Sequence, residues 1–324
     1  MEYARLGAGK CLISRVGFGC ASISGYDYGP VDEPAWMRTV REALDCGINF
    51  FDVADVYGFG RGEEMLSRAL GEQRHKVVLA TKFGLVWDSQ GEIRRDASPK
   101  TIEQALNESL RRLRVESITL YQLHWPDTVT PPGEILETLK LFQDRGKIQF
   151  IGLSNVSLEQ LESAHRTHPV DSAQVPYNLL CRGIEERFLS WCDVNQIGVL
   201  AHSGLARGLL SGRRPLGSHF KGSDTRNQSA YFAPEGRQQK EALVRALCET
   251  GRRARCSPAA AALRWLLDHR QVTSVLVGMN NLTQLKENLR AVGWRLPCAD
   301  YELLSFHSAS CPGSLSGTLA NKRL

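Results

Sequence analysis

The feature that most constrains the fold is a regular alternation of short β-rich runs with longer stretches of helical periodicity, from about residue 15 to residue 290. This pattern is typical of repeated βα units, whose strands form a parallel sheet. The runs that indicate strands are 16–19, 49–52, 77–81, 118–124, 150–154, 172–175, 198–202 and 274–277. The stretches that indicate helices include 34–45, 63–70, 99–113, 133–145, 158–165, 185–195 and 282–290.

Eight such units favour an α/β architecture closed into a (β/α)8 TIM barrel over an open doubly wound sheet. An open dinucleotide-binding sheet needs a Gly-x-Gly-x-x-Gly turn between a strand and a helix. The nearest match, at residues 17–22, lacks the third glycine. Ahead of the first strand, residues 3–6 and 11–14 flank a glycine-containing turn. They predict a β-hairpin that caps the bottom of the barrel.

Length and composition suit one domain with a large core, because the chain has 324 residues, of which 42% are hydrophobic and 23% charged. We expect this domain to span residues 1–324. Two segments, at about 204–234 and about 297–324, are predicted to be long loops or extra helices near an end of the barrel.

Charge and cysteine usage indicate a cytoplasmic protein with a small-molecule partner. The net charge of +5 is spread along the chain, without the dense basic stripe that nucleic-acid binding needs. A mild positive balance suits a small anionic ligand such as a phosphorylated cofactor. The nine cysteines are scattered without a CxxC pair or zinc spacing, which fits reduced thiols. No signal peptide or membrane span is indicated, and nothing points to a particular oligomeric state.

Titratable residues stand at the predicted carboxyl ends of neighbouring strands, where barrel enzymes build their active sites. Asp52 closes the second strand and Tyr57 follows in the loop. Lys82 follows the third strand and His124 closes the fourth. Taken singly, each is more often a cap, a packing residue, a surface lysine or a core histidine. Together on successive strands they indicate a catalytic unit.

These four residue types suit the reduction of a carbonyl group, which needs a hydride donor and an acid for the developing alkoxide. Tyr57 is the predicted general acid. The ammonium of Lys82 would favour the tyrosinate, and Asp52 would pair with Lys82 and fix its position. His124 would donate a hydrogen bond to the carbonyl oxygen and orient it.

Five segments carry a resemblance to a known family. They are 51–58 (FDVADVYG), 81–84 (TKFG), 121–127 (YQLHWPD), 146–148 (GKI) and 151–155 (IGLSN). In order and spacing they resemble the aldo-keto reductase superfamily over nearly the whole chain. Their forms are closer to its bacterial-type and sugar-dehydrogenase-like branches than to the mammalian aldose reductases. The resemblance implies a catalytic tetrad of Asp52, Tyr57, Lys82 and His124 and a nicotinamide cofactor.

The resemblance also implies a set of cofactor contacts. Ser154, Asn155 and Gln174 would hydrogen-bond the nicotinamide carboxamide, and Tyr177 would stack on the ring. Residues 201–212 (AHSGLARGLLSG) are similar to the family's pyrophosphate loop. The residues of this loop expected at the phosphates are Ser203, Leu205, Arg207 and Gly208. Relatives usually carry proline where Gly204 stands, so a more mobile backbone is expected there.

Residues 277–288 (VGMNNLTQLKEN) are similar to the segment that binds the adenosine end. The expected contacts in this segment are Gly278, Asn280, Gln284, Glu287 and Asn288. Relatives that select NADPH commonly place Lys or Arg on the 2′-phosphate here, whereas Gly278, Asn280 and Gln284 occupy the expected positions in this chain. Because members of the family commonly use NADPH, we expect NADPH as the cofactor. A preference for NADH, or the use of both cofactors, remains an alternative.

Aromatic residues in the loops after the first four strands predict the substrate pocket. They are Tyr26, Tyr28, Phe59, Trp87 and Trp125. Such a lining suits an aldehyde or ketone such as a sugar or a natural-product carbonyl. Two alternatives remain. One is a sugar or alcohol dehydrogenase that works in the oxidative direction. The other is a cofactor-binding regulatory module with little turnover, like the reductase-like beta subunits of voltage-gated potassium channels.

Overall fold

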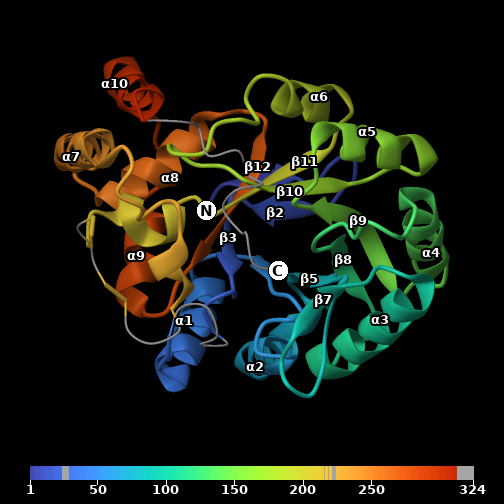
Figure 1. Ribbon diagram of the computed structural model, residues 1–324. Coiled ribbons are helices and arrows are strands. Elements are labelled where there is room, and N and C mark those ends of the chain that lie inside the picture. Colours follow the sequence, from blue (N-terminus) through green and yellow to red (C-terminus); the bar gives the residue numbers. More distant parts are fainter. Residues whose placement is uncertain (24–28, 215, 218, 221–223, 312–324) are drawn as a thin grey trace.

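In the part of the chain that the computed structural model describes, eight parallel strands close into a barrel surrounded by helices (Figure 1). The described residues are 1–23, 29–214, 216–217, 219–220 and 224–311. Around the barrel, the strands are β3 (Val16–Gly19), β4 (Phe50–Asp52), β5 (Val78–Phe83), β8 (Ile118–Leu123), β9 (Ile148–Ser154), β10 (Ser172–Pro176), β11 (Gly198–His202) and β12 (Val272–Gly278), which pairs with β3. The predicted (β/α)8 barrel and its strands are confirmed.

The predicted helices are also present. In chain order they are α1 (Glu33–Asp45), α2 (Arg61–Leu70), α3 (Pro99–Leu113), α4 (Pro132–Asp144), α5 (Leu158–Thr167), α6 (Phe188–Val194) and α9 (Leu282–Leu289). The first residues of α5 and α3 favour a helix start. Ser157 forms a capping box with Gln160 at the start of α5, and α3 begins at Pro99 after the N-cap Ser98.

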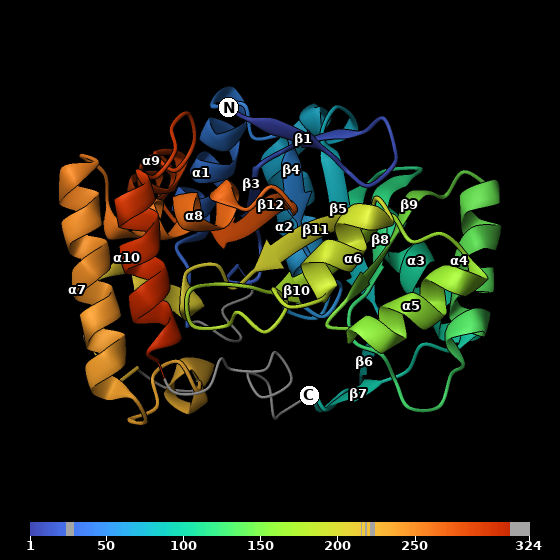
Figure 2. The same ribbon diagram turned by 90° about the horizontal axis from the view of Figure 1, so that it is seen from above.

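Three further helices of the described chain lie outside the predicted set: α7 (Arg237–Arg253), α8 (Pro258–Asp268) and α10 (Cys298–Ala309). Helix α10 occupies the start of the predicted tail, and it lies beside α7 on the outside of the barrel (Figure 2). Arg253 of α7 pairs there with Asp300 of α10. This part of the tail therefore extends the outer layer of helices. No helix among the described residues is long and apolar enough to cross a bilayer.

The N-terminal hairpin closes one end of the barrel, as predicted. Strands β1 (Tyr3–Arg5) and β2 (Leu12–Ser14) pair antiparallel. Leu6 and Ile13 are fully buried in a cluster with barrel side chains such as Phe50 and Leu200. Because these apolar groups fill the bottom of the barrel, they leave its other end for polar side chains.

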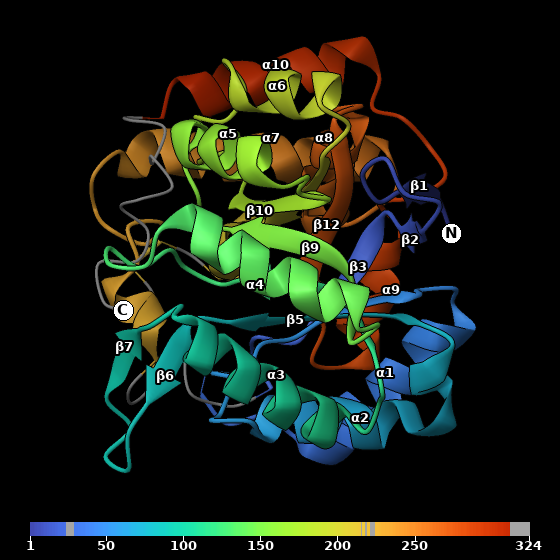
Figure 3. The same cartoon turned by 90° about the vertical axis from the view of Figure 1, so that its right-hand side faces the viewer.

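A second hairpin lies at the opposite end of the barrel, and its strands were not predicted. It consists of β6 (Leu85–Trp87) and β7 (Ile93–Arg95), joined by a turn in which Asp88 Oδ1 accepts the N–H groups of Gln90 and Glu92. Figures 2 and 3 both show it far from the N-terminal hairpin, beyond the carboxyl ends of the barrel strands. Strands this short carry little periodicity for a sequence to reveal.

Candidate active site

A buried ion pair occupies the centre of the polar end of the barrel. Lys82 on β5 and Asp52 at the end of β4 come together because these strands are neighbours. The Nζ of Lys82 lies 2.5 Å from Asp52 Oδ1 and also donates to the carbonyl of Val53 at 3.0 Å. Their exposed fractions are only 1% and 4%. Charges so deeply buried are tolerated only when paired and hydrogen-bonded.

Tyr57 and His124 complete the predicted group of four. The Nζ of Lys82 lies 5.5 Å from the centroid of the Tyr57 ring. The Tyr57 and His124 rings meet edge to face, with centroids 5.8 Å apart and an interplanar angle of 82°. His124 follows directly after β8 and is buried, whereas Tyr57 is partly exposed. The structure thus brings together the side chains that the sequence placed at separate strand ends.

His124 is held in the neutral form. Burial, together with the nearby charge of Lys82, lowers the pKa of His124 well below its ordinary value. Its Nδ1 is buried and has no hydrogen-bond partner among the described residues. A neutral imidazole can donate one hydrogen bond to an oxygen atom without adding a positive charge to the site.

Two glutamines saturate the second oxygen of Asp52. The Nε2 atoms of Gln122 and Gln174 donate to Asp52 Oδ2 at 3.1 and 2.9 Å. The Nε2 of Gln174 also lies 3.3 Å from Gln122 Oε1. Gln174 therefore lies at the predicted site, but its amide nitrogen is directed toward the ion pair.

Side chains at the ends of β9 and β11 form an adjoining hydrogen-bonded group. Asn155 Nδ2 donates to Ser154 Oγ and to the carbonyl of His124, both at 3.0 Å. His202 Nε2 lies 3.1 Å from Asn155 Oδ1, and its Nδ1 lies 3.1 Å from Ser203 Oγ. Asn155 and Ser203 have φ values of 56° and 57°, an uncommon conformation that clusters at functional sites.

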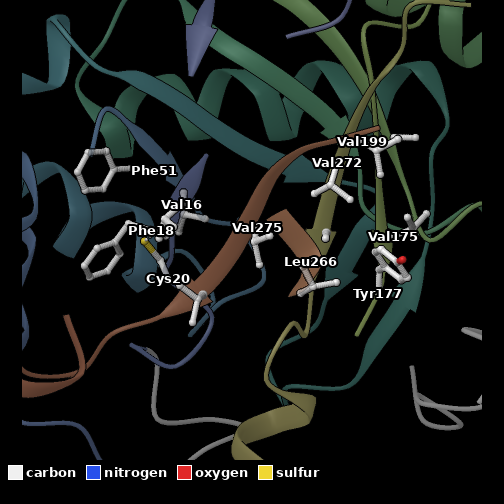
Figure 4. Close-up of a cluster of buried hydrophobic side chains, with 14 of the residues drawn as sticks. Val16, Phe18, Cys20, Phe51, Val175, Tyr177, Val199, Leu266, Val272 and Val275 are labelled. Carbon is white, nitrogen blue, oxygen red and sulfur yellow. Dashed lines mark hydrogen bonds between the residues drawn. The ribbon is translucent and has the colours of Figure 1, made fainter. Parts of the chain in front are cut away.

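The expected stacking role of Tyr177 is wrong for the conformation that the structure shows. The side chain has no exposed surface, and Figure 4 shows it among buried hydrophobic residues together with Val175. Its hydroxyl bonds to Glu185 Oε1 at 2.7 Å and to His269 Nε2 at 2.9 Å, and its ring packs against Trp265. Tyr177 thus belongs to the layer between the barrel and the outer helices, where no face is open to a ligand.

The loop after β11 contains several residues in the left-handed conformation. Within the short helical segment Ala206–Ser211, the φ values of Ala206, Arg207 and Gly208 are all positive, at 48°, 56° and 101°. The N–H of Ala206 donates to the Ser203 carbonyl at 2.7 Å, so it is engaged within the loop. Gly208 N–H donates to the Leu205 carbonyl at 2.9 Å, and Arg207 Nη1 donates to Thr225 Oγ1 at 3.0 Å.

Gly204, at the entrance to this loop, is tightly packed. A Cβ atom there would lie 2.9 Å from Val275 Cγ1 and 3.0 Å from Leu266 Cδ1. The glycine is buried where two core side chains leave no room for another, which gives a packing reason for glycine at this position.

The first part of the segment after β12, residues 279–285, carries no charged side chain. Gly278 ends β12 and is exposed. Asn280 Oδ1 accepts a hydrogen bond from Ser22 Oγ at 2.6 Å, and its N–H donates to Gln284 Oε1 at 2.7 Å. Gln284 thus lies folded back over the start of α9, where Asn281 caps its N–H. The side-chain carbonyl oxygens of Asn280 and Gln284 are therefore both engaged, the first by Ser22 and the second by the Asn280 N–H.

Further along α9, Glu287 pairs with Arg213 from the segment after β11, with 2.5 Å between Oε1 and Nη2. This ion pair joins the loop after β11 to α9. Asn288 is only 3% exposed and faces the interior of the protein. The predicted adenosine-end residues therefore share one short segment, but Glu287 and Asn288 differ in their access to solvent.

Three of the predicted pocket residues gather beside Tyr57. Trp125 belongs to a small hydrophobic cluster against which Tyr57 and Trp87 pack. The centroids of the Phe59 and Trp87 rings are 5.6 Å apart, and the Arg95 guanidinium lies 5.0 Å from the Trp125 ring. The unpredicted β6–β7 hairpin brings Trp87 to this wall. The other two predicted residues, Tyr26 and Tyr28, lie outside the described residues.

Gln122 and His202 are site residues that the sequence analysis missed. Gln122 stands two residues before His124, so strand alternation puts both on the same face of β8. His202 ends β11 in the same way that His124 follows β8. The search for polar and titratable side chains at the carboxyl ends of strands, which identified the tetrad, could therefore have identified Gln122 and His202 as well.

Comparison with known proteins identifies the family. The aldo/keto reductase family profile matches residues 15–308. The chain is 36% identical over 303 residues to the aldo-keto reductase YhdN of Bacillus subtilis (strain 168), covering 93% of this chain and 91% of that protein. It is 30% identical over 319 residues to the NADH-specific methylglyoxal reductase of Escherichia coli (strain K12), covering 94% and 97%. The structure of the glycerol dehydrogenase AKR11B4 from Gluconobacter oxydans matches with a TM-score of 0.88 and 34% identity, covering 96% of each chain.

The chain belongs to the aldo/keto reductase family. It is therefore an oxidoreductase that uses a nicotinamide cofactor and acts on small carbonyl compounds. This confirms the family and the class of enzyme that the sequence motifs predicted, including the bacterial-type branch.

The depressed pKa values of the site histidines predict a stability that depends on pH. Burial, with the charges of Lys82 and Arg207, lowers the pKa of His202 to about 3. The unfolded chain binds a proton on this residue below about pH 6.5, whereas the folded chain does not until near its own pKa. The contribution of His202 to the free energy of unfolding is thus fully present above about pH 6.5 and is lost as the pH falls toward 3.

We therefore expect the free energy of unfolding of His202→Gln to fall less steeply than that of the wild type between about pH 6.5 and 5, by up to about 1 kcal/mol per pH unit. Urea unfolding at a series of pH values measures both slopes. Parallel slopes would show that His202 titrates alike in the folded and unfolded chains.

Proposed function

We propose that the chain reduces an aldehyde or ketone to an alcohol with NAD(P)H, using Tyr57 as the general acid. One observation carries this proposal: a buried, hydrogen-bonded Lys82–Asp52 pair lies beside the partly exposed ring of Tyr57. An ammonium group favours the ionised form of a neighbouring phenol, so Lys82 would make Tyr57 a stronger acid.

The residues around the tetrad fit a nicotinamide dinucleotide. The loop after β11 offers the hydroxyl of Ser203 and the guanidinium of Arg207, groups that can bind a diphosphate. Ser154, Asn155 and Gln174 provide amide and hydroxyl groups next to the tetrad, where the carboxamide of a nicotinamide would bind. We propose Ser203, Leu205, Arg207 and Gly208 for the diphosphate, and Gly278, Asn280, Gln284, Glu287 and Asn288 for the adenosine end.

The proposed mechanism assigns each tetrad residue a separate task. When bound, the nicotinamide supplies the hydride that reduces the carbonyl carbon. Tyr57 gives its hydroxyl proton to the carbonyl oxygen as negative charge develops there. Lys82 stabilises the tyrosinate that results, while Asp52 holds the ammonium in place. Neutral His124 donates a hydrogen bond to the same carbonyl oxygen and orients it.

The aromatic wall of Phe59, Trp87 and Trp125 suits small carbonyl compounds with an apolar face, including sugars. Two relatives have names that point to small oxygenated substrates, a methylglyoxal reductase and a glycerol dehydrogenase. The second name also supports a second candidate function, the oxidation of an alcohol with NAD(P)⁺. In that direction the Tyr57 tyrosinate accepts the proton that it gives in the reduction.

The role of Tyr57 is tested by Tyr57→Phe. Tyr3→Phe is the matched control, because Tyr3 is 47% exposed and far from Tyr57 in the sequence. We expect Tyr57→Phe to lower kcat by about 10²- to 10⁴-fold, since the proton donor is lost.

The dissociation constant of the cofactor should stay close to the wild-type value in Tyr57→Phe. Oxidation of NADPH with a panel of aldehydes measures turnover, and wild-type turnover in Tyr57→Phe would refute the proposed role.

For the cofactor, NADPH is our first proposal, with weak discrimination against NADH. The expected contact positions Gly278, Asn280 and Gln284 offer neutral groups, and the nearby Arg213 is paired with Glu287. Without a cation committed to the 2′-phosphate, the charge-assisted gain of about 1.5–3 kcal/mol is missing. We expect dissociation constants for NADPH and NADH within about tenfold of each other, measured by quenching of protein fluorescence. A larger preference for either cofactor would contradict this assignment.

A further inference from the structure

We propose that Gln122 is a positioning residue, which together with Asp52 orients the amide of Gln174 toward the nicotinamide. This inference rests on the proposed function, because it assumes that the nicotinamide carboxamide binds beside Gln174. In this arrangement the carbonyl oxygen of Gln174 accepts a hydrogen bond from the NH₂ of the carboxamide.

The orientation of both glutamine amides follows from the acceptor that they share. Asp52 Oδ1 accepts from Lys82, and Asp52 Oδ2 faces the amide ends of Gln122 and Gln174. A carboxylate paired with a lysine only accepts hydrogen bonds, so each glutamine must turn its NH₂ group toward it. The carbonyl end of each amide therefore points away from Asp52.

Gln122 uses the second N–H of Gln174. The Nε2 of Gln174 lies 2.9 Å from Asp52 Oδ2 and 3.3 Å from Gln122 Oε1. An amide NH₂ has two N–H groups, and these two acceptors together account for both. With its nitrogen held in this way, Gln174 has its carbonyl oxygen left to offer to a ligand.

Strand β9 lies between the strands of the two glutamines, and a glycine on β9 leaves room for their side chains to make contact. Gln122 on β8 is in register with Gly152 on β9, and Gly152 is in register with Ser172 on β10. A Cβ atom at Gly152 would lie 2.8 Å from Gln122 Cγ and 2.6 Å from Ser172 Oγ. Because Gly152 has no side chain, the side chain of Gln122 can cross β9 and reach Gln174 on the next strand.

Burial makes this arrangement costly to disturb. Gln122 is fully buried, and Gln174 and Asp52 are 3% and 4% exposed. Loss of Gln122 leaves a buried carboxylate oxygen with one amide in place of two, and leaves the NH₂ group of Gln174 with one of its two acceptors. A preorganised acceptor binds its ligand more tightly than one that must first be ordered.

The test compares the binding of NADH and NADPH with that of ADP-ribose, which lacks the nicotinamide. For Gln122→Leu we expect about three- to tenfold weaker binding of the two cofactors and unchanged binding of ADP-ribose. Gln149→Leu, at an exposed position on β9, is the matched control and should bind all three as the wild type does. Isothermal titration calorimetry gives the dissociation constants without any turnover.

A second variant gives a signature that a purely structural role would not produce. In Gln122→Glu, the protonated carboxyl can still donate to Asp52, but its ionised form places two carboxylates in contact. NADH binding by this variant should therefore weaken as the pH rises from about 5 to 8, while the wild type changes less. Gly152→Ala, which displaces Gln122 without altering it, should weaken cofactor binding in the same direction as Gln122→Leu.

The outcomes separate the two proposals. If the wild type binds neither NADH nor NADPH, the proposed function fails. If it binds them but Gln122→Leu matches it for the cofactors, the role of Gln122 is refuted. Equal losses for the cofactors and ADP-ribose would also refute that role, since they would indicate a general defect. Should Gln122→Leu fail to fold, Gln122→Met and Gln122→Glu decide by the same criteria.

Discussion

The buried contact between Lys82 and Asp52 sets the requirements that the rest of the site meets. Two charges at 2.5 Å, removed from water, are stable only when their remaining hydrogen-bonding capacity is satisfied. The carbonyl of Val53 takes a second donor of Lys82, and Gln122 and Gln174 saturate the other oxygen of Asp52. The positive charge of Lys82 lies close to the Tyr57 ring. The same charge contributes to keeping His124 neutral.

The barrel makes this contact possible by joining residues that are far apart in sequence. Asp52, Lys82, Gln122 and Gln174 come from four strands, and the hydrogen bonds among them span as many as 122 positions. The N-terminal hairpin fills the opposite end with apolar groups, so polar side chains gather at one end only. Gly152 adds a local condition, since its missing side chain lets an amide cross from β8 to β10.

The sequence predicted the barrel, its strands and the close approach of the tetrad, because each of these depends on local periodicity and on residues at strand ends. Tyr177 was misjudged for a physical reason. It stands three positions after Gln174, and successive side chains of a strand alternate between its faces. Gln174 points into the barrel, so Tyr177 shares the outward face with Val175 (Figure 4). The β6–β7 hairpin and the pairing of Arg213 with Glu287 depend on tertiary contacts that no local pattern encodes.

The central claim is that the ammonium of Lys82 makes Tyr57 an effective acid. The most direct measurement is the ionisation of Tyr57, followed by NMR of ring-labelled tyrosine and assigned with Tyr57→Phe. It is made in the wild type and in Asp52→Asn/Lys82→Met, which removes the ammonium without leaving a buried carboxylate unpaired. The account predicts that Tyr57 ionises at lower pH in the wild type than in the double variant. Ionisation at the same pH in both proteins would contradict it.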